Sequence, residues 1–325
     1  MKAIIWSKYG PPKHLAYKEV ERPILKDDEV LIKVYATTAM PGDCEIRRFD
    51  MHVLFWLPLR LYFGLFKPKR PILGMELAGE IVGLGREVKT LKVGDAVIAG
   101  AGLRMGAYGQ FVCLPAKNNI TLKPEKLSYE QVASLSTAGI NALHYIREAK
   151  LQPGQSILIN GAAGCFGTYA IQLAKLQGTE VTGVDSTTKI DKLIEIGADF
   201  AIDYTKEDFT KNEKKYDVIF DLRGTRSVRK LLSSLKSGGK YILATPWVFQ
   251  VLKGLVLSLF SDKKFIFSLA AEKKEDLDYL KNLMAEGKIK PIIGKTFPLE
   301  EMVAAHEYVE SGDKIGNVII SVPHE

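Results

Sequence analysis

Residues 156–167 read SILINGAAGCFG, and this stretch decides the fold. The first five residues predict a short buried strand, and Gly161, Gly164 and Gly167 then lead into a helix. In such a turn one glycine permits a sharp bend, another lets the backbone approach a pyrophosphate, and the last allows close packing of helix on sheet. The helix N-terminus adds free N–H groups and a positive dipole end, which favour phosphate. The stretch therefore predicts dinucleotide binding, with an ordinary tight turn as the alternative.

The pattern on either side of this turn alternates between the two kinds of regular structure. Strand-like runs recur at 180–184, 200–203, 216–221, 240–245 and 264–268. Helical patterns lie between most of them, at 165–177, 188–196 and 227–235. Alternating strands and helices predict an α/β fold with a doubly wound parallel sheet.

Asp185 ends the next strand, 18 residues after Gly167. An acidic side chain there hydrogen-bonds the ribose hydroxyls of NAD and repels the 2′-phosphate of NADP. Ser186 and Lys189 follow closely, and a hydroxyl with a cation suits a 2′-phosphate. An alternative role for Ser186 or Thr188 is to cap the next helix. Asp185 tilts the prediction toward NADH and leaves NADPH open.

The flanking regions are of a different character. Residues 1–117 hold short β-rich runs punctuated by Gly and Pro, which predict a small or partly open barrel. A capping box at 128–131 predicts a helix that continues to about residue 149. Two further helices, 274–286 and 299–310, precede a final strand at 317–322. These last sixty or so residues are too few for a separate domain, so we expect them to pack back onto the first.

Composition excludes several classes of protein. The 325 residues carry a net charge of +7, but the lysines are dispersed among acidic residues, unlike the basic stripe of a nucleic-acid-binding protein. The three cysteines, Cys44, Cys113 and Cys165, form neither a disulfide framework nor a C-x-x-C zinc motif. With no visible signal peptide, a reducing, cytoplasmic location is the natural interpretation.

Several segments together resemble the medium-chain dehydrogenase/reductase superfamily. They are GMELAGEIVG at 74–83, KVGD at 92–95, NGAAGCFG at 160–167, AIQLAK at 170–175 and DVIFD at 217–221. The resemblance covers nearly the whole chain in order. It implies a GroES-like, partly open β-barrel catalytic domain at 1–120 and 266–325. A Rossmann-type dinucleotide-binding domain at 121–265 would complete the chain.

The branch of that superfamily is indicated by absent zinc ligands. Met40 stands where the zinc-dependent members carry a cysteine, and Met75 where they carry a histidine. Thioethers do not make a Zn²⁺ site, and Cys44 beside Asp43 has no histidine near it in a motif. The chain therefore resembles the zinc-independent, quinone-oxidoreductase-like branch. It departs from that branch at Met40 (usually Asn), Glu45 (commonly Tyr), Asn317 (frequently Lys) and the Thr245-Pro246 pair (usually Gly).

The resemblance assigns specific residues to a cofactor site and to a substrate site. Those near the cofactor would be Thr137, Asn141, Gly161, Gly164, Cys165, Phe166, Gly167, Asp185, Ser186, Lys189, Asp221, Thr245 and Asn317. Those near the substrate would be Met40, Asp43, Trp56, Tyr62, Met75, Tyr108 and Trp247. Helix packing is the alternative role for Thr137 and Asn141, and strand packing for Tyr108. No catalytic residue is identified, because solvent is able to protonate a quinol.

Two unusually apolar stretches, 52–66 and 247–260, are shorter than the roughly 18 residues that span a membrane. We expect them to flank the mouth of the cleft, and their apolar side chains to form a lid over a hydrophobic acceptor. The lid would consist of Leu54, Phe55, Trp56, Leu57, Tyr62, Trp247, Val248 and Phe249. Subunit-interface burial and core packing are the alternatives. Peripheral membrane contact, with Arg60, Lys67, Lys69 and Arg70 as flanking cations, is disfavoured.

The favoured function is zinc-independent, NAD(P)H-dependent reduction of small hydrophobic quinones, enones or related carbonyls by hydride transfer. An enoyl-thioester reductase is the first alternative, and it would need a polar anchor such as Arg47, Arg48 or Lys67. A low-turnover NAD(P)H-binding sensor or scaffold is the second, favoured by Met40 and Glu45. The resemblance also implies a homodimer, formed through the predicted strand 264–268.

Overall fold

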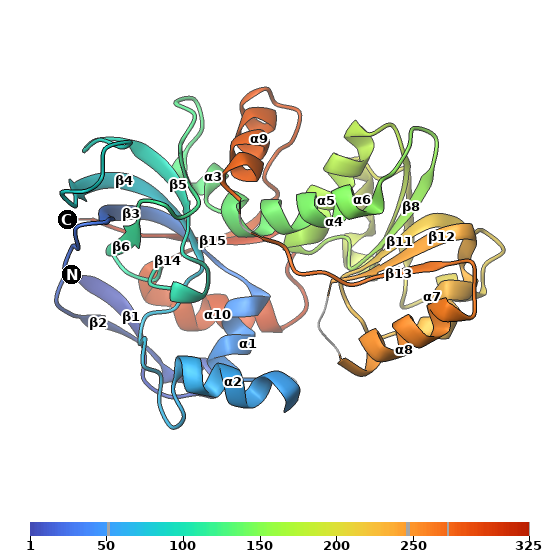
Figure 1. The fold of residues 1–325 in the computed structure, drawn as a ribbon, viewed down its shortest axis with the longest axis horizontal. Coiled ribbons are helices and arrows are strands. Elements are labelled where there is room, and N and C mark those ends of the chain that lie inside the picture. The colour runs from blue at the N-terminus through green and yellow to red at the C-terminus, as the bar shows by residue number, and fades with distance from the viewer. Residues whose placement is uncertain (51–52, 245–247, 272, 325) are drawn as a thin grey trace. The chain divides into compact units, whose positions relative to one another are not determined.

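The computed structural model describes residues 1–50, 53–244, 248–271 and 273–324, with the side chains of 53–55 excepted (Figure 1). The chain divides into two compact units. Unit 1 consists of Met1–Ile140 and Glu272–Glu325, and unit 2 of Asn141–Ala271. Each unit has its own sheets and its own buried interior.

Unit 2 is built on a six-stranded sheet in which all neighbouring strands are parallel. Its spatial order is β10 (Phe200–Asp203), β9 (Glu180–Asp185), β8 (Ser156–Asn160), β11 (Tyr216–Asp221), β12 (Leu235–Leu243) and β13 (Lys264–Ile266). The order 3-2-1-4-5-6 along the chain is that of the doubly wound dinucleotide-binding fold. The predicted parallel sheet is therefore confirmed.

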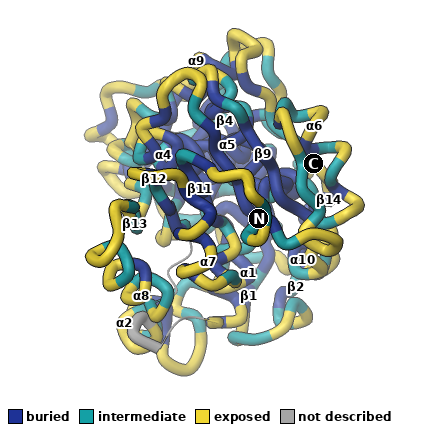
Figure 2. The backbone as a smooth tube through the Cα atoms, turned by 90° about the vertical axis from the view of Figure 1, so that its right-hand side faces the viewer, coloured by how far each residue is buried: buried dark blue, intermediate teal, exposed yellow. Residues whose placement is uncertain are grey.

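The central strands are the most buried part of this sheet, and in β8 all five residues are buried (Figure 2). The connecting helices are α4 (Ile140–Ala149), α5 (Cys165–Leu176), η4 (Thr187–Lys189), α6 (Ile190–Ile196), η5 (Phe209–Lys211), α7 (Val228–Ser233) and α8 (Val248–Leu259). Sheet strands that are covered on both faces carry continuous apolar runs, as SILIN does. Burial of the central residues of its strands stabilises the sheet. Polar side chains are then placed at the two ends of the strands.

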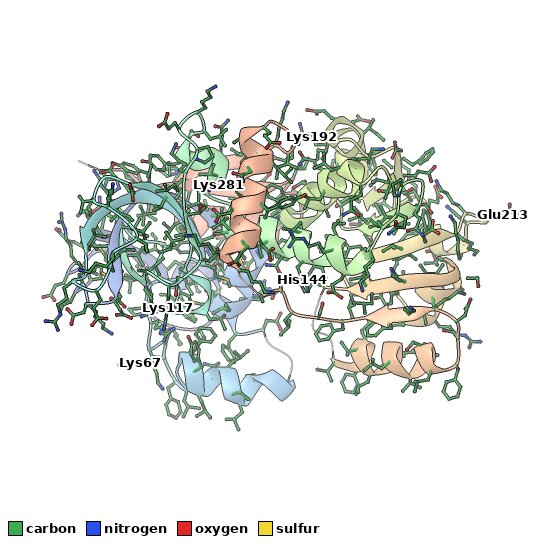
Figure 3. All side chains as sticks on the ribbon, turned by 45° about the horizontal axis from the view of Figure 1, so that its top comes forward. Lys67, Lys117, His144, Lys192, Glu213 and Lys281 are labelled. Atoms are coloured by element: carbon green, nitrogen blue, oxygen red, sulfur yellow. The ribbon has the colours of Figure 1, made fainter. Side chains whose placement is uncertain are left out.

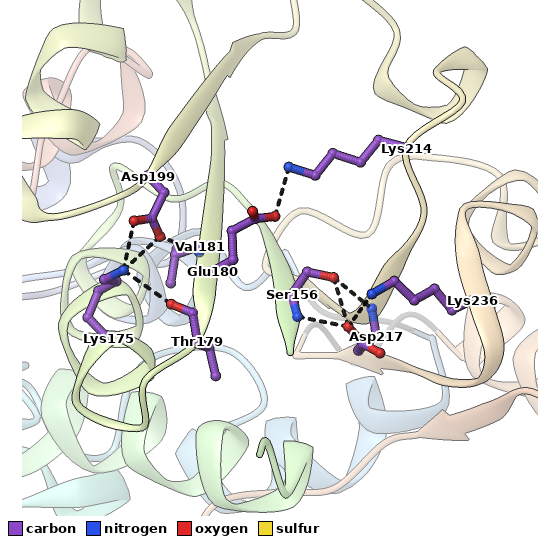
Figure 4. Close-up of polar contacts among 9 residues, drawn as sticks. All are labelled: Ser156, Lys175, Thr179, Glu180, Val181, Asp199, Lys214, Asp217 and Lys236. Carbon is purple, nitrogen blue, oxygen red and sulfur yellow. Dashed lines mark hydrogen bonds and ion pairs between the residues drawn. The ribbon is translucent and has the colours of Figure 1, made fainter. Parts of the chain in front are cut away.

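Polar pairs close the amino-end edge of the sheet (Figure 4). Asp217 accepts hydrogen bonds from the backbone and hydroxyl of Ser156, both at 2.8 Å, and pairs with Lys236 at 2.7 Å. Lys175 pairs with Asp199 at 2.8 Å, and Asp199 also accepts from a backbone N–H of β9. These interactions fix where the strands begin. Ligands of such sheets bind at the opposite, carboxyl-end edge.

Unit 1 contains a seven-stranded sheet and a separate two-stranded one. The spatial order of the larger sheet is β14 (Ile293–Pro298), β15 (Asn317–Ser321), β3 (Glu29–Ala39), β4 (Glu76–Leu84), β5 (Ala96–Gly100) and β7 (Ile120–Leu122), with β6 (Phe111–Pro115) paired to β3. The smaller sheet is β1 (Lys2–Trp6) with β2 (Leu15–Glu19). The C-terminal segment joins the larger sheet, because β15 pairs antiparallel with β3.

The helices of unit 1 surround these strands. They are η1 (Pro12–His14), α1 (Pro41–Arg48), α2 (Val53–Phe63), η2 (Gly102–Arg104), α3 (Tyr129–Val132), η3 (Leu135–Gly139), α9 (Lys274–Ala285), η6 (Leu299–Glu301) and α10 (Met302–Glu310). One continuous helix was expected over 128–149, and this expectation is wrong. The chain is broken at η3, a π-type turn, where the N–H of Thr137 donates to the Glu76 carboxylate at 2.7 Å. A side-chain acceptor inserted into the helical ladder has this effect.

The two apolar stretches form helices α2 and α8, which the pattern did not predict. In α2 the apolar residues lie all round the helix, so the one-sided period of an amphipathic helix is weak; in α8 that period is present. Among the described residues, no helix is long and apolar enough to cross a membrane.

Arg47 joins α1 to the C-terminal part of unit 1. Its side chain is fully buried, donates to the Gly10 carbonyl at 2.8 Å and pairs with Glu310 at the end of α10. Arg48, 40% exposed, pairs with the same carboxylate at 2.8 Å. The sequence offered Arg47 as an anchor for a carrier group, and its burial against Glu310 excludes that role. Its burial removes one of the groups that an enoyl-thioester reductase would use.

We expect Arg47→Ala to destabilise the protein by about 3–5 kcal/mol, because it leaves Glu310 and the Gly10 carbonyl without their buried partner. Arg48→Ala is the matched control. It removes an exposed partner of the same carboxylate and should cost no more than about 1 kcal/mol. Urea unfolding of the two variants and the wild type measures both values. Equal losses would show that burial of Arg47 does not matter.

Candidate functional site

The glycine turn has the geometry of a phosphate-binding turn. Gly161 follows β8 with φ of +87°, a value that only glycine adopts without strain. The N–H groups of Gly161 and Ala162 donate to the Val184 carbonyl of β9, at 3.0 and 3.1 Å. A Cβ on Gly167 would overlap the backbone of Ala162, so the start of α5 packs directly on the turn. Gly164 is the N-cap of α5 and lies in extended conformation. The residues present therefore fit a pyrophosphate.

Asp185 is held rigidly at the carboxyl end of β9. One carboxylate oxygen accepts from the N–H of Ala163 in the glycine turn, at 3.0 Å, and the other from its neighbour Ser186, at 2.9 Å. Lys189 lies within 3.2 Å of the same carboxylate, and both side chains are about one-tenth exposed. The pair places one negative and one positive group beside the turn, where the ribose of a bound dinucleotide would lie.

Asp221, at the carboxyl end of β11, is fully buried and saturated with hydrogen bonds. One oxygen accepts from the Asn160 side chain at 2.8 Å and from the N–H groups of Arg223 and Gly224 at 3.0 and 3.1 Å. The other accepts from the Tyr241 hydroxyl at 3.0 Å. These donors come from β8, β12 and the loop after β11. Asp221 therefore acts as a positioning residue for three strand ends.

The other residues assigned to the cofactor are dispersed. Cys165 is buried in the first turn of α5, and Phe166 beside it is half-buried. Thr137 belongs to unit 1 and Asn141 to unit 2. Asn317 is buried at the start of β15, where its side chain donates to the Ile292 carbonyl at 3.2 Å. Thr245 lies outside the described residues.

Unit 1 buries a carboxylate that the sequence did not single out. Glu76 begins β4 and is fully buried. It accepts from the Thr38 hydroxyl at 2.7 Å and from the N–H of Thr137 at 2.7 Å. Burial raises the pKa of Glu76 to about 8, although these two hydrogen bonds lower it. Glu76 therefore links β3 and β4 to η3 and changes charge near neutral pH.

A chain of buried polar groups lies in the same unit. The Cys44 sulfur is 3.2 Å from Nδ1 of His306, and Nε2 of His306 is 3.2 Å from the Tyr108 hydroxyl. Burial raises the pKa of Asp43 to about 7, while the Tyr108 hydroxyl lowers it. Burial, with Arg47 nearby, lowers the pKa of His306 to about 3. The His306 ring is therefore neutral at neutral pH, and every side chain of this chain of polar groups is buried.

Sequence reasoning named Asp43 and Tyr108 but missed His306. Asp43 and Tyr108 are both fully buried, so neither presents a polar group to solvent. His306 stands alone on α10, far along the chain from Cys44 and Tyr108, and no local motif marks it.

Comparison with known proteins agrees with a nucleotide-binding turn in unit 2 and a second, β-rich unit 1. Residues 26–125 match the alcohol dehydrogenase GroES-like domain, and residues 196–320 match the family described as zinc-binding dehydrogenase. The chain is 32% identical over 336 residues to a 2-methylene-furan-3-one reductase of Solanum lycopersicum, covering 98% of this chain and 79% of that protein. The structure of the quinone oxidoreductase from Coxiella burnetii superposes with a TM-score of 0.89 at 31% identity, covering 99% of each chain. The chain belongs to the medium-chain dehydrogenase/reductase superfamily, in its quinone-oxidoreductase-like branch.

A further relative within the superfamily is the NADPH-dependent alkenal/one oxidoreductase, chloroplastic, of Arabidopsis thaliana. It is 30% identical over 336 residues, with 98% of this chain and 79% of that protein covered. The glycine turn, Asp185 and Lys189 are the features of this chain that fit the nicotinamide dinucleotide of a medium-chain reductase.

The metal implied by the zinc-binding name does not fit this member of the superfamily. The sulfur atoms of Met40 and Met75 both lie beside Gly42, within 4.0 and 3.6 Å of where its Cβ would be. Two thioethers replace the thiolate and imidazole that Zn²⁺ requires. Within the described part of the chain, no three His, Cys, Asp or Glu side chains gather as a metal site would need.

The apolar candidates for the lid lie on the surface of their units. Trp56 is 41% exposed, Leu57 55% and Tyr62 42%, which excludes core packing for these three. The Tyr62 hydroxyl donates to the Leu103 carbonyl at 3.3 Å and accepts from Arg70 at 2.6 Å. Trp247 and the side chains of Leu54 and Phe55 lie outside the described residues. The lid as a whole stays a prediction.

Glu76→Gln tests the buried carboxylate, because it keeps an acceptor oxygen but cannot ionise. The folded-state pKa of about 8 lies above the unfolded value of about 4.3, so the folded protein holds an extra proton between these values. Stability of the wild type should therefore fall as pH rises through this window, with Asp43 contributing. Urea unfolding at acidic and mildly alkaline pH measures this fall. We expect the variant to lose less stability, by on the order of 3 kcal/mol. An unchanged pH dependence would contradict the assignment.

Proposed function

We propose that this protein is an NAD(P)H-dependent reductase of quinones, enones or related hydrophobic carbonyl compounds, working without zinc. The observation that carries the proposal is a complete pyrophosphate turn combined with thioethers in place of metal ligands. The activities for which the tomato, Arabidopsis and Coxiella proteins are named support the same substrate classes.

The chain's own residues account for binding and orientation. The N–H groups at the start of α5, which follow the glycine turn, would hold the pyrophosphate, and Asp185 the adenosine ribose. Bound there, the nicotinamide supplies a hydride to an electrophilic carbon. Met40 and Met75 offer no Lewis acid, so an acceptor must be activated by its own conjugation. Quinones and enones meet that condition, and holding the reactants close together supplies much of the acceleration.

The Asp185–Lys189 pair is the element on which cofactor choice depends. The carboxylate favours NADH, because it accepts from ribose hydroxyls and repels a 2′-phosphate. Lys189 offsets that repulsion and is placed to bind a phosphate. We propose a modest preference for NADH with NADPH also accepted, although the Arabidopsis relative is named as NADPH-dependent.

We further propose that the protein is a cytoplasmic homodimer. The described β13 is an edge strand paired only to β12, so its other side is free for a second copy. All three cysteines are free, as expected in a reducing compartment.

The function is tested by anaerobic oxidation of NADH and NADPH against small quinones, long-chain enones and crotonyl thioesters. We expect turnover with quinones or enones that a chelator leaves unchanged. Turnover of crotonyl thioesters alone would favour an enoyl-thioester reductase. Tight cofactor binding without turnover of any acceptor would overturn the reductase proposal in favour of a sensor or scaffold. The burial of Asp43 and Tyr108, which leaves neither free to reach a substrate, favours that alternative.

Two substitutions test cofactor choice separately from acceptor choice. Lys189→Ala removes the cation and should lower kcat/KM for NADPH by about 10-fold while changing that for NADH little. Asp185→Ser removes the repulsion and should shift the ratio toward NADPH by a similar factor. Lys192→Ala, which changes a half-buried lysine on α6 paired with Glu195, is the control. Equal loss with both cofactors in Lys189→Ala would show that the residue has only a structural role.

A further inference from the structure

Helix α8 turns an apolar face to solvent. Val251 and Leu257 pack against the core of unit 2, and Gly254 lies against the Phe265 ring. The opposite side, here called the α8 face, consists of Leu252, Leu255, Val256, Leu259 and Phe260, which are exposed by 54%, 49%, 53%, 80% and 85%. A surface helix normally presents polar side chains there. Contiguous exposed apolar residues mark an interaction site.

The surroundings of the α8 face carry more cations than acids. Between Asp221 and Asp262 the sequence contains seven basic residues and no acidic one. Lys253 is exposed on α8 itself, and Arg229 and Lys230 are exposed on α7, which packs against α8. The carboxylate of Asp262 accepts from the Ser237 hydroxyl at 2.5 Å and the Gly238 N–H at 3.0 Å.

These charges discriminate between the possible occupants. In a symmetric contact between two copies, the cations of one surface would meet those of the other, in excess over the neighbouring Asp262. An anionic bilayer satisfies both features, because apolar side chains enter the acyl boundary while Lys and Arg contact the headgroups. We propose that the α8 face docks the protein peripherally on an anionic phospholipid membrane. Dimerisation through β13 would use a different surface.

Unit 1 repeats the pattern at the end of α2. Phe66 is 91% exposed, beside Leu61 at 53% and Leu65 at 44%. These residues line a surface hollow of about 410 Å³ together with Lys67 and Lys69. Residues 51–75 contain four basic residues and no acidic one, and Figure 3 shows Lys67 just beyond α2. The sequence alone disfavoured membrane contact. The apolar side chains are exposed, which no sequence pattern reveals, and this exposure now favours membrane contact.

The test is sedimentation with vesicles of phosphatidylcholine alone and of equal parts phosphatidylcholine and phosphatidylglycerol. The wild type should bind the anionic vesicles, less strongly at high salt, and bind neutral vesicles weakly. Leu255→Gln combined with Leu259→Gln should lower the partition coefficient by roughly 10-fold for each leucine. Ile24→Gln and Val93→Gln put the same glutamine at exposed apolar positions of unit 1 outside α2, and should leave binding unchanged.

The readout is binding, so the proposal stands or falls independently of the proposed function. A near-UV circular dichroism spectrum of the double variant that matches the wild type shows that it is folded. Failure of the wild type to bind anionic vesicles, or equal binding by the double variant, would overturn the proposal. So would a lipid-free dimer that the double variant dissociates, since a second copy would then cover the α8 face.

Discussion

The buried carboxylate of Asp221 is the interaction on which the nucleotide half-site depends. Its four hydrogen bonds join the ends of β8 and β12 to the loop after β11. A buried carboxylate is costly unless its lone pairs are satisfied, so the donors must keep their positions. The glycine turn leaves β8 directly after Asn160, which is one of those donors. The hydrogen bonds around Asp221 therefore fix the position of the turn, although Asp221 itself need not contact the cofactor.

Unit 1 follows the same principle with Glu76. That carboxylate holds Thr38 of β3 and interrupts the helical ladder at Thr137, so that a π-type turn replaces a continuous helix. The cost of burying Glu76 and Asp43 appears as raised pKa values, about 8 and about 7. π-type turns are frequent at functional sites, and here the residue that takes the irregular geometry is one that the family resemblance assigns to the cofactor.

The sequence predicts the parallel sheet well because its signal is local. SILIN followed by spaced glycines encodes both a strand and the turn after it, and similar units repeat. Helix α2 escaped prediction because residues that are apolar all round have no period. The break at η3 and the His306 contacts depend on partners far away in sequence, Glu76, Cys44 and Tyr108. Site residues that act through their own backbone were therefore predictable, and those defined by a distant partner were not.

The sheet of unit 2 also connects the α8 face to the nucleotide turn. Chain leaving the carboxyl end of β12 leads to α8, and chain leaving the carboxyl end of β8 forms the glycine turn. Only β11 separates these two strands, so both exits share the edge where ligands of doubly wound sheets bind. A membrane surface held by α8 would bring lipid-dissolved acceptors to that edge, while the dinucleotide enters from water. If the proposed zinc-free reduction holds, such concentration would add to the positioning on which that reaction depends.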